Sequence, residues 1–137
     1  MHLSQCRVGC VDAAPRGRRF ESSTMAYGAT VGLGRSIEYL GSLGWSRVFA
    51  HGMALADRLA AGLFELGASI VSPRLPNAKS PIVSARFPGR EPRAVVAHLG
   101  RAGIVVSARR DGVRFSPHVY NTETDIDQVI ATLRELR

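Results

Sequence analysis

The sequence predicts an α+β fold in which helices pack on a small, mostly antiparallel sheet. The chain has 137 residues, the length of one ordinary domain. Apolar residues recur at helical spacing in two long segments, 45–67 and 122–136, and short β-type runs lie between them. Two of these runs are joined by Asp111-Gly112, which is typical of a hairpin. The expected order is therefore helix, helix, strand, strand, helix, hairpin, helix.

The N-terminal part divides into an irregular leader and a first helix. Residues 1–18 contain two glycines and a proline but no apolar period, so we expect them to lie outside the domain. Residues 24–43 follow a helical apolar pattern, although each glycine inside it costs about 1 kcal/mol relative to alanine. Gly41 and Gly44 are expected to end this helix.

The middle of the chain predicts a second helix, two strands and a third helix. Residues 45–67 form an amphipathic helix that ends at its C-terminal glycine. Residues 68–71 and 82–87 are expected to be short strands, separated by a proline-rich loop. Pro92 suits the first turn of a helix that runs to about residue 102 and stops at Gly103.

A hairpin is predicted for residues 104–116. Asp111-Gly112 favours a two-residue turn because both residues tolerate positive φ. This turn sets Arg109 directly opposite Arg114 and places a polar set on one face of the hairpin. The side chains expected on that face are Arg109, Arg114, Ser107 and Ser116.

The chain is expected to close with an amphipathic helix. Thr122 and Asp125 have the spacing of a capping box, in which each residue bonds the backbone of the other at a helix start. Apolar residues at helical steps follow this start. They are Ile126, Val129, Ile130, Leu133 and Leu136.

The two arginines of the hairpin allow two interpretations. Like charges opposite each other repel, and an anion between Arg109 and Arg114 would remove that repulsion. Arginine suits this task because its planar guanidinium donates two parallel hydrogen bonds to a carboxylate or phosphate. The simpler interpretation is that both side chains extend into solvent. The pattern alone favours solvent.

Composition excludes several classes of protein. Hydrophobic residues make up 45% and charged residues 21% of the chain, as in an average globular protein, so disorder, collagen and coiled coil are excluded. The formal net charge is +7, but seventeen of the eighteen basic residues are arginine and they are scattered, which weakens a nucleic-acid interpretation. No apolar run could span a bilayer and the start lacks a signal peptide's apolar block, so we expect a cytoplasmic protein.

No metal site is predicted. Cys6 and Cys10 are the only cysteines, and their spacing fits neither a redox motif nor half of a zinc site. The four histidines have none of the spacings that metal ligands on a helix require.

Two separated motifs resemble those of class V aminotransferases, the pyridoxal-phosphate (PLP) enzymes of fold type I that include cysteine desulfurases and isopenicillin N epimerase-like proteins. Residues 114–122, Arg-Phe-Ser-Pro-His-Val-Tyr-Asn-Thr, resemble the C-terminal signature of the family. Residues 19–24, Arg-Phe-Glu-Ser-Ser-Thr, resemble a segment that leads into a glycine-rich helix. The resemblance implies that residues 19–137 form the small C-terminal domain of such an enzyme.

The resemblance also implies residue roles. In such enzymes the arginine of the C-terminal signature binds the α-carboxylate of the substrate, and this arginine maps onto Arg114. Arg109 remains a second candidate for substrate binding from the hairpin pattern described above. The threonine of the other motif bonds the cofactor phosphate of the neighbouring subunit and maps onto Thr24. PLP, an amino-acid substrate and a homodimer or a large-domain partner are thus implied.

The family's catalytic machinery is not matched in this chain. Family members are roughly three times as long, and their large domain carries the lysine that binds PLP. Lys79 is the only lysine here, and it lies in a proline-bounded loop, so no catalytic residue is assigned. The hairpin has no cysteine where desulfurases hold their sulfur-accepting thiol, which favours an epimerase-, lyase- or transaminase-like parent.

We therefore expect a truncated or split small domain that is not catalytic alone. Two alternatives from other classes are a basic module that binds anions or nucleic acid, and a scaffold that docks onto an intact relative. Steep loss of affinity with salt would mark the nucleic-acid module.

Overall fold

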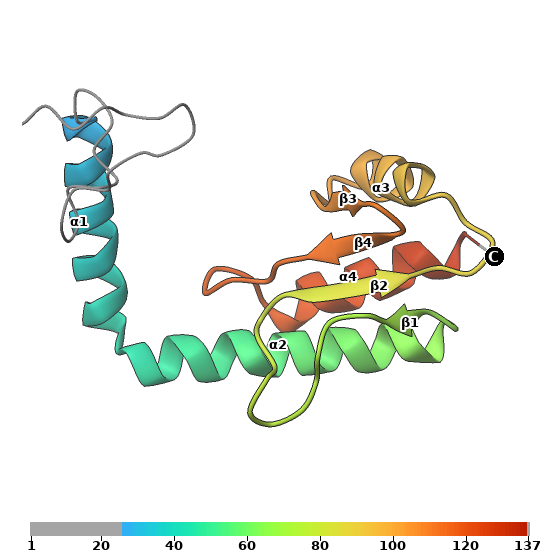
Figure 1. Cartoon of the computed structure of the whole chain (residues 1–137), viewed down its shortest axis with the longest axis horizontal. Coiled ribbons are helices and arrows are strands. Elements are labelled where there is room, and N and C mark those ends of the chain that lie inside the picture. Colours follow the sequence, from blue (N-terminus) through green and yellow to red (C-terminus); the bar gives the residue numbers. More distant parts are fainter. Residues whose placement is uncertain (1–25, 137) are drawn as a thin grey trace, which may run out of the picture. The chain divides into compact units, whose positions relative to one another are not determined.

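The computed structural model describes residues 26–136, and the chain separates into two units that meet between Tyr39 and Leu40 (Figure 1). The expectations for the leader at 1–18, for the two cysteines and for Thr24 lie outside the described residues. No helix within 26–136 is long and apolar enough to cross a membrane.

The first unit contains most of a single helix, α1, which spans Tyr27–Leu43. The predicted helix is confirmed from residue 27 onward. Its end differs from the prediction, because Gly41 lies inside the helix and only Gly44, with φ of 87°, follows it. None of the α1 residues is buried.

The second unit is a four-stranded sheet with helices, and it confirms the predicted α+β class and element order. Every pair of neighbouring strands is antiparallel, in the order β1-β2-β4-β3. The elements are α2 (Trp45–Glu65), β1 (Ser69–Ile70), β2 (Val83–Arg86), α3 (Pro92–Arg101), β3 (Ser107–Arg109), β4 (Gly112–Phe115) and α4 (Glu123–Arg134).

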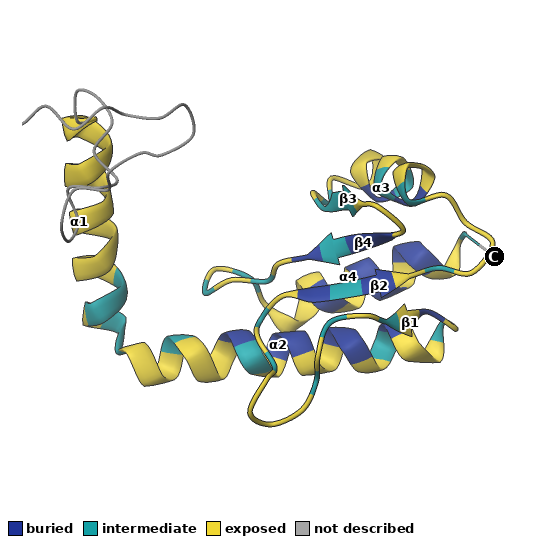
Figure 2. Ribbon diagram, in the orientation of Figure 1, coloured by how far each residue is buried: buried dark blue, intermediate teal, exposed yellow. Residues whose placement is uncertain are grey.

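One apolar core joins the sheet to α2, α3 and α4 (Figure 2). Alternate residues of the two central strands face this core, because successive side chains of a strand point to opposite faces. The buried residues of β2 and β4 are Val83, Ala85, Val113 and Phe115. The helices contribute Leu55, Leu59, Leu63, Val95, Leu99, Ile126, Val129 and Leu133. The alternate residues of the same strands therefore form a second face that no residue of this core covers.

The residues predicted to begin or end α2, α3 and α4 do so in the structure. Pro92 occupies the first turn of α3. Gly67 and Gly103 follow α2 and α3 with φ of 82° and 76°, a conformation that glycine adopts without steric cost. Thr122 and Asp125 form both hydrogen bonds of the capping box at the start of α4. Local sequence therefore determines where these three helices begin or end.

The predicted register of the hairpin is wrong, because the two-residue turn lies one position earlier in the sequence than Asp111-Gly112. Arg109 lies opposite Gly112, and Arg114 lies opposite Ser107, so the two turn residues are Arg110 and Asp111. The reason is the neighbouring strand β2. A Cβ atom on Gly112 would lie 2.6 Å from the carbonyl oxygen of Ala85, so a residue without a side chain must pair here, inside the sheet. This register also avoids setting two arginines directly opposite each other.

Candidate functional site

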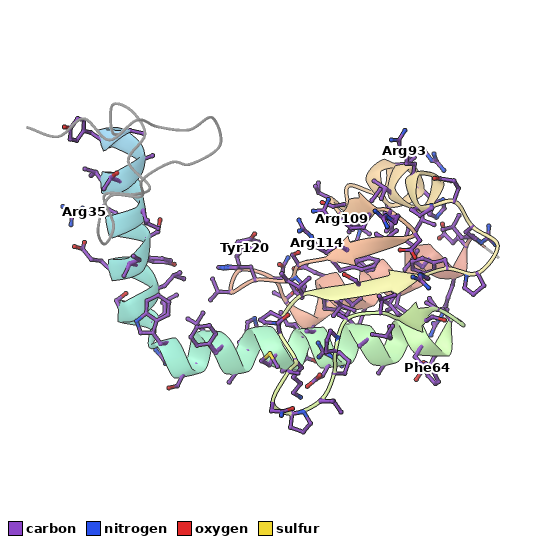
Figure 3. The ribbon with its side chains drawn as sticks, viewed as in Figure 1. Arg35, Phe64, Arg93, Arg109, Arg114 and Tyr120 are labelled. Atoms are coloured by element: carbon purple, nitrogen blue, oxygen red, sulfur yellow. The ribbon has the colours of Figure 1, made fainter. Side chains whose placement is uncertain are left out.

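The face of the sheet turned away from the apolar core carries serines and arginines. Arg114 is the central residue, with Ser84 of β2 opposite it on one side and Ser107 of β3 opposite it on the other. Arg109 lies two residues beyond Ser107 and therefore on the same face. Figure 3 shows Arg109 extending from β3 and Arg114 from β4. The prediction that both arginines share a face is confirmed, although they are diagonal neighbours.

Arg114 is half-buried and holds an unused hydrogen-bond donor. Its Nε is buried and has no hydrogen-bond partner among residues 26–136. A buried donor without an acceptor costs about 1–3 kcal/mol, and more for a charged group. No carboxylate of residues 26–136 forms an ion pair with this guanidinium either. A bound carboxylate would supply both the missing acceptor and the missing charge.

Arg109 is exposed and only weakly engaged. Its Nη1 donates to the carbonyl oxygen of the adjacent Ala108 at 3.4 Å, and it forms no ion pair within the described part of the chain. Gly112 lies opposite it and contributes no side chain. The position beside Arg109 on β4 therefore contributes backbone only, and the side chain of Arg86 on β2 lies next to it.

Arg86 is the third arginine of this face, and its charge is balanced locally. It lies two residues from Ser84 on β2 and forms an ion pair with Asp111 of the hairpin turn. Because Asp111 is taken up by Arg86, it does not neutralise the arginines of β3 and β4. The unbalanced positive charge of the face resides on Arg109 and Arg114.

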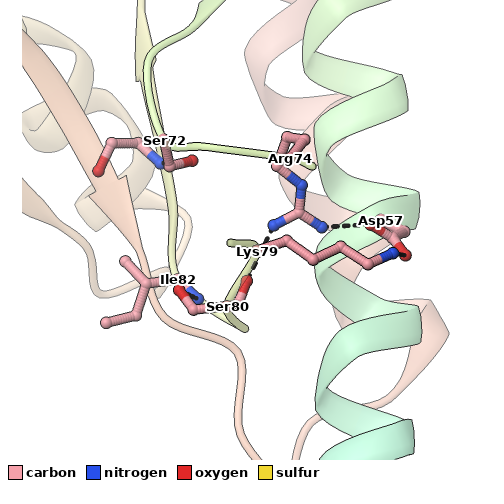
Figure 4. Close-up of polar contacts among 7 residues, drawn as sticks. Asp57, Ser72, Arg74, Lys79, Ser80 and Ile82 are labelled. Atoms are coloured by element: carbon pink, nitrogen blue, oxygen red, sulfur yellow. Dashed lines mark hydrogen bonds and ion pairs between the residues drawn. The ribbon is translucent and has the colours of Figure 1, made fainter. Parts of the chain in front are cut away.

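Lys79, the only lysine, does not fit the role of a cofactor-binding lysine. It lies in the loop between β1 and β2, where its Nζ donates to Asp57 of α2 at 2.8 Å (Figure 4). Arg74 of the same loop also pairs with Asp57 and donates to the carbonyl oxygen of Ser80 at 2.8 Å. Hydrogen bonds from Lys79 and Arg74 hold the pKa of Asp57 below its ordinary value, against the opposing effect of burial.

The described residues therefore fit a carboxylate but not the attachment of PLP. The amine of Lys79 is committed to Asp57, and the arginine-bearing face contains no lysine. Thr24, the residue predicted to bond the cofactor phosphate, lies outside the described residues.

The segment after β4 is organised by hydrogen bonds. The backbone N–H of His118 donates to Oδ1 of Asn121 at 2.9 Å, and the His118 ring stacks on Tyr120. Backbone and side-chain hydrogen bonds from Thr122 and Asn121 hold the pKa of Asp125 below its ordinary value. These contacts fix the course of the chain from β4 into α4.

Two contacts of the site depend on residues that sequence analysis did not single out. Ser84 flanks Arg114 only because β2 pairs with β4, and the Nε2 of His51 bonds the carbonyl oxygen of Asn121 at 2.9 Å across seventy positions of sequence. No pattern of neighbouring residues predicts either contact, because each joins segments that are far apart in the sequence.

Other features offer less chemistry. A cleft of about 450 Å³ lies between the loop before β3 and the start of α4, with Val105, Pro117, Tyr120 and Gln128 among its lining residues. It is separate from Arg109 and Arg114, which do not line it. Within residues 26–136 no three histidine, cysteine or acidic side chains gather as a metal site.

Comparison with known proteins places this chain in a family. The profile of the family Aminotransferase class-V matches residues 4–129. Two curated relatives, each described as a probable cysteine desulfurase, come from Streptomyces coelicolor and Pyrococcus abyssi. The first is 30% identical over 90% of this chain, and the second is 27% identical over 98% of it.

Solved structures agree with this placement. The apo structure of cysteine desulfurase from Thermococcus onnurineus matches 88% of this chain with a TM-score of 0.78 and 29% identity. A NifS-like protein matches 84% with a TM-score of 0.71 and 27% identity. The chain spans only about a third of these proteins: 33% and 37% of the curated relatives, and 33% and 34% of the two structures. With the family profile matching nearly the whole chain, this protein belongs to the class V aminotransferase family.

Proposed function

We propose that this chain is the small, carboxylate-binding part of a PLP-dependent class V enzyme that acts on an amino acid. The observation that carries the proposal is Arg114, whose buried Nε has no hydrogen-bond partner among the described residues. Its two cross-strand neighbours are Ser84 and Ser107, whose side chains are short. The α-carboxylate of an amino acid is the ligand that this charge and donor geometry suit.

The hairpin favours an epimerase-, lyase- or transaminase-like reaction over desulfuration. Its two strands, Ser107–Arg109 and Gly112–Phe115, are joined by two residues only, and none of these residues is a cysteine. A desulfurase needs a thiol to accept sulfur, and both cysteines of this chain precede residue 11. The relatives described as cysteine desulfurases therefore identify the family here rather than the reaction.

These 137 residues are not catalytic alone in this proposal. PLP chemistry requires a lysine that holds the cofactor, and the only lysine is paired with Asp57. The relatives are about three times as long, so a large domain of the family's type is the natural source of that lysine.

Helix α1 supplies a surface for such a partner. Four of its apolar side chains are between 51% and 71% exposed: Tyr27, Val31, Leu33 and Ile37. Exposed apolar groups on this scale mark an interaction surface. We propose that the large domain, on the same or another chain, covers them.

Titration with propionate, a simple carboxylate, tests the proposed role of Arg114. We expect the Nε–H resonance of Arg114 in the ¹⁵N-labelled chain to shift saturably together with the backbone N–H resonances of its neighbours Ser84 and Ser107, and the response of the two serines to disappear in Arg114→Gln. Arg93→Gln is the matched control, because it removes one exposed arginine of α3 and leaves the sheet face intact. An Arg114 resonance that does not respond, or a response equally lost in Arg93→Gln, would contradict the proposal.

A further inference from the structure

We propose that Arg109 forms a second anion-binding group beside Arg114, so that the site takes a substrate with two acidic groups, such as an amino dicarboxylic acid. This inference rests on the proposed function, because it takes Arg114 as the holder of the α-carboxylate. It assigns the substrate class through the second acidic group.

The register of the sheet sets the spacing of the two arginines. Arg114 pairs with Ser107, and Arg109 is two residues further along β3, which makes the two arginines diagonal neighbours on one face. Diagonal neighbours of an antiparallel pair lie roughly 7–8 Å apart at their Cα atoms, within reach of long side chains. Two guanidinium groups at this spacing can hold the two ends of one small molecule.

The two strand positions between the arginines on β3 and β4 carry only small residues, and the side chain of Arg86 on β2 runs beside one of them, Gly112. Gly112 lies directly opposite Arg109 and next to Arg114 on the same face of the sheet. A side chain cannot be accommodated there, since its Cβ would meet the carbonyl oxygen of Ala85 at 2.6 Å. Ser107 lies directly opposite Arg114 on β3, and its side chain is short. A ligand can thus lie against the strands between the arginines.

The charges of the face leave both arginines available. Asp111 is the acidic residue at the hairpin turn, and it pairs with Arg86. Among residues 26–136, Arg109 and Arg114 form no ion pair, and the only hydrogen bond of the Arg109 side chain is a long one to its neighbour's carbonyl oxygen. Two adjacent like charges without counter-charges repel each other, and a dianion relieves this repulsion better than a monoanion does.

Comparing succinate with propionate tests the inference, with the Nε–H resonances of Arg109 and Arg114 as the readout. We expect succinate to bind about tenfold more tightly than propionate, because a second charge-assisted hydrogen bond is engaged. In Arg109→Gln the affinity for succinate should fall by about that factor while the affinity for propionate is unchanged. Any preference for succinate over propionate that remains in Arg109→Gln measures the contribution of the second negative charge of succinate in the absence of Arg109.

Arg93→Gln is again the matched control, since it lowers the net charge equally and lies on α3 rather than on the sheet. It should leave the ratio of the two affinities unchanged. If Arg109→Gln weakens both acids equally, or neither, the second anion site is wrong while the role of Arg114 stands. If neither acid moves the Arg114 resonance, the proposed function fails as well.

Discussion

Gly112 is the residue on which the geometry of the candidate site depends. The Asp111-Gly112 pair predicts that Gly112 is a turn residue, but Gly112 lies in β4, where its missing side chain allows the close approach to β2. Replacing it with alanine would push the Cβ into the carbonyl oxygen of Ala85. Such overpacking against backbone costs about 1–3 kcal/mol.

We predict that Gly112→Ala lowers the free energy of unfolding by this amount in urea. The matched control is Gly100→Ala, because a Cβ at Gly100 of α3 meets no atom within 4 Å. Alanine there should stabilise the helix by up to about 1 kcal/mol. Equal effects of the two substitutions would show that the close approach at β2 is not what constrains Gly112.

The ionisation of Asp57 affects the stability of the fold. Its pKa is lowered by hydrogen bonds from Lys79 and Arg74, so its pairing stabilises the folded state above the ordinary carboxyl pKa of 3.8. That stabilisation is lost as the pH falls through the lower pKa of the folded state. We predict that Asp57→Asn destabilises the chain at pH 7 and that the difference from the wild type shrinks below pH 3.8, as measured by urea unfolding. A difference that does not change with pH would contradict the assignment.

At the scale of elements, local signals were sufficient for helix ends and insufficient for strand pairing. The capping box of Thr122 and Asp125 and the glycines after α2 and α3 act through contacts within a few residues, and all were predicted. The hairpin register depends on β2, some thirty positions earlier, which meets Gly112 at Ala85. Turn preference alone therefore selected the wrong two residues.

The part of the candidate site that depends on a single hairpin could be predicted, and the part that depends on β2 could not. Arg109 and Arg114 could be placed on one face because side chains alternate along a strand, and the shift in register left that alternation unchanged. The serine on the other side of Arg114 could not be predicted, because no local pattern pairs β2 with β4.

The start of α4 gives a prediction at this scale. Thr122 accepts a hydrogen bond from the backbone N–H of Asp125 at the first turn. Thr122→Ala removes that acceptor, and we predict a loss of about 1 kcal/mol in the free energy of unfolding. Thr122→Ser keeps the hydroxyl and should retain most of the stability. If the serine variant is as unstable as the alanine variant, the cap is not the cause.

At the scale of the whole molecule, the exposed helix α1 predicts association. The chain spans about a third of its relatives, and the apolar side chains of α1 are exposed in it. We predict concentration-dependent self-association in analytical ultracentrifugation, reduced in the double variant Leu33→Gln/Ile37→Gln. Val105→Gln is the control, because Val105 is 96% exposed but lies before β3. A chain that stays monomeric at all concentrations would contradict this prediction.

In the proposed function this chain binds the carboxylate of the substrate, and another domain or chain carries the lysine that holds PLP. The Nζ of Lys79 donates to the carboxylate of Asp57 at 2.8 Å and must leave it before it can approach an aldehyde, so Lys79 should react poorly while Asp57 holds it. The most direct test is to incubate the chain with PLP, reduce it with borohydride and locate the adduct by mass spectrometry. The account predicts little labelling of Lys79, with no saturation, and more in Asp57→Asn. Saturable, stoichiometric labelling of Lys79 in the unmodified chain would contradict it.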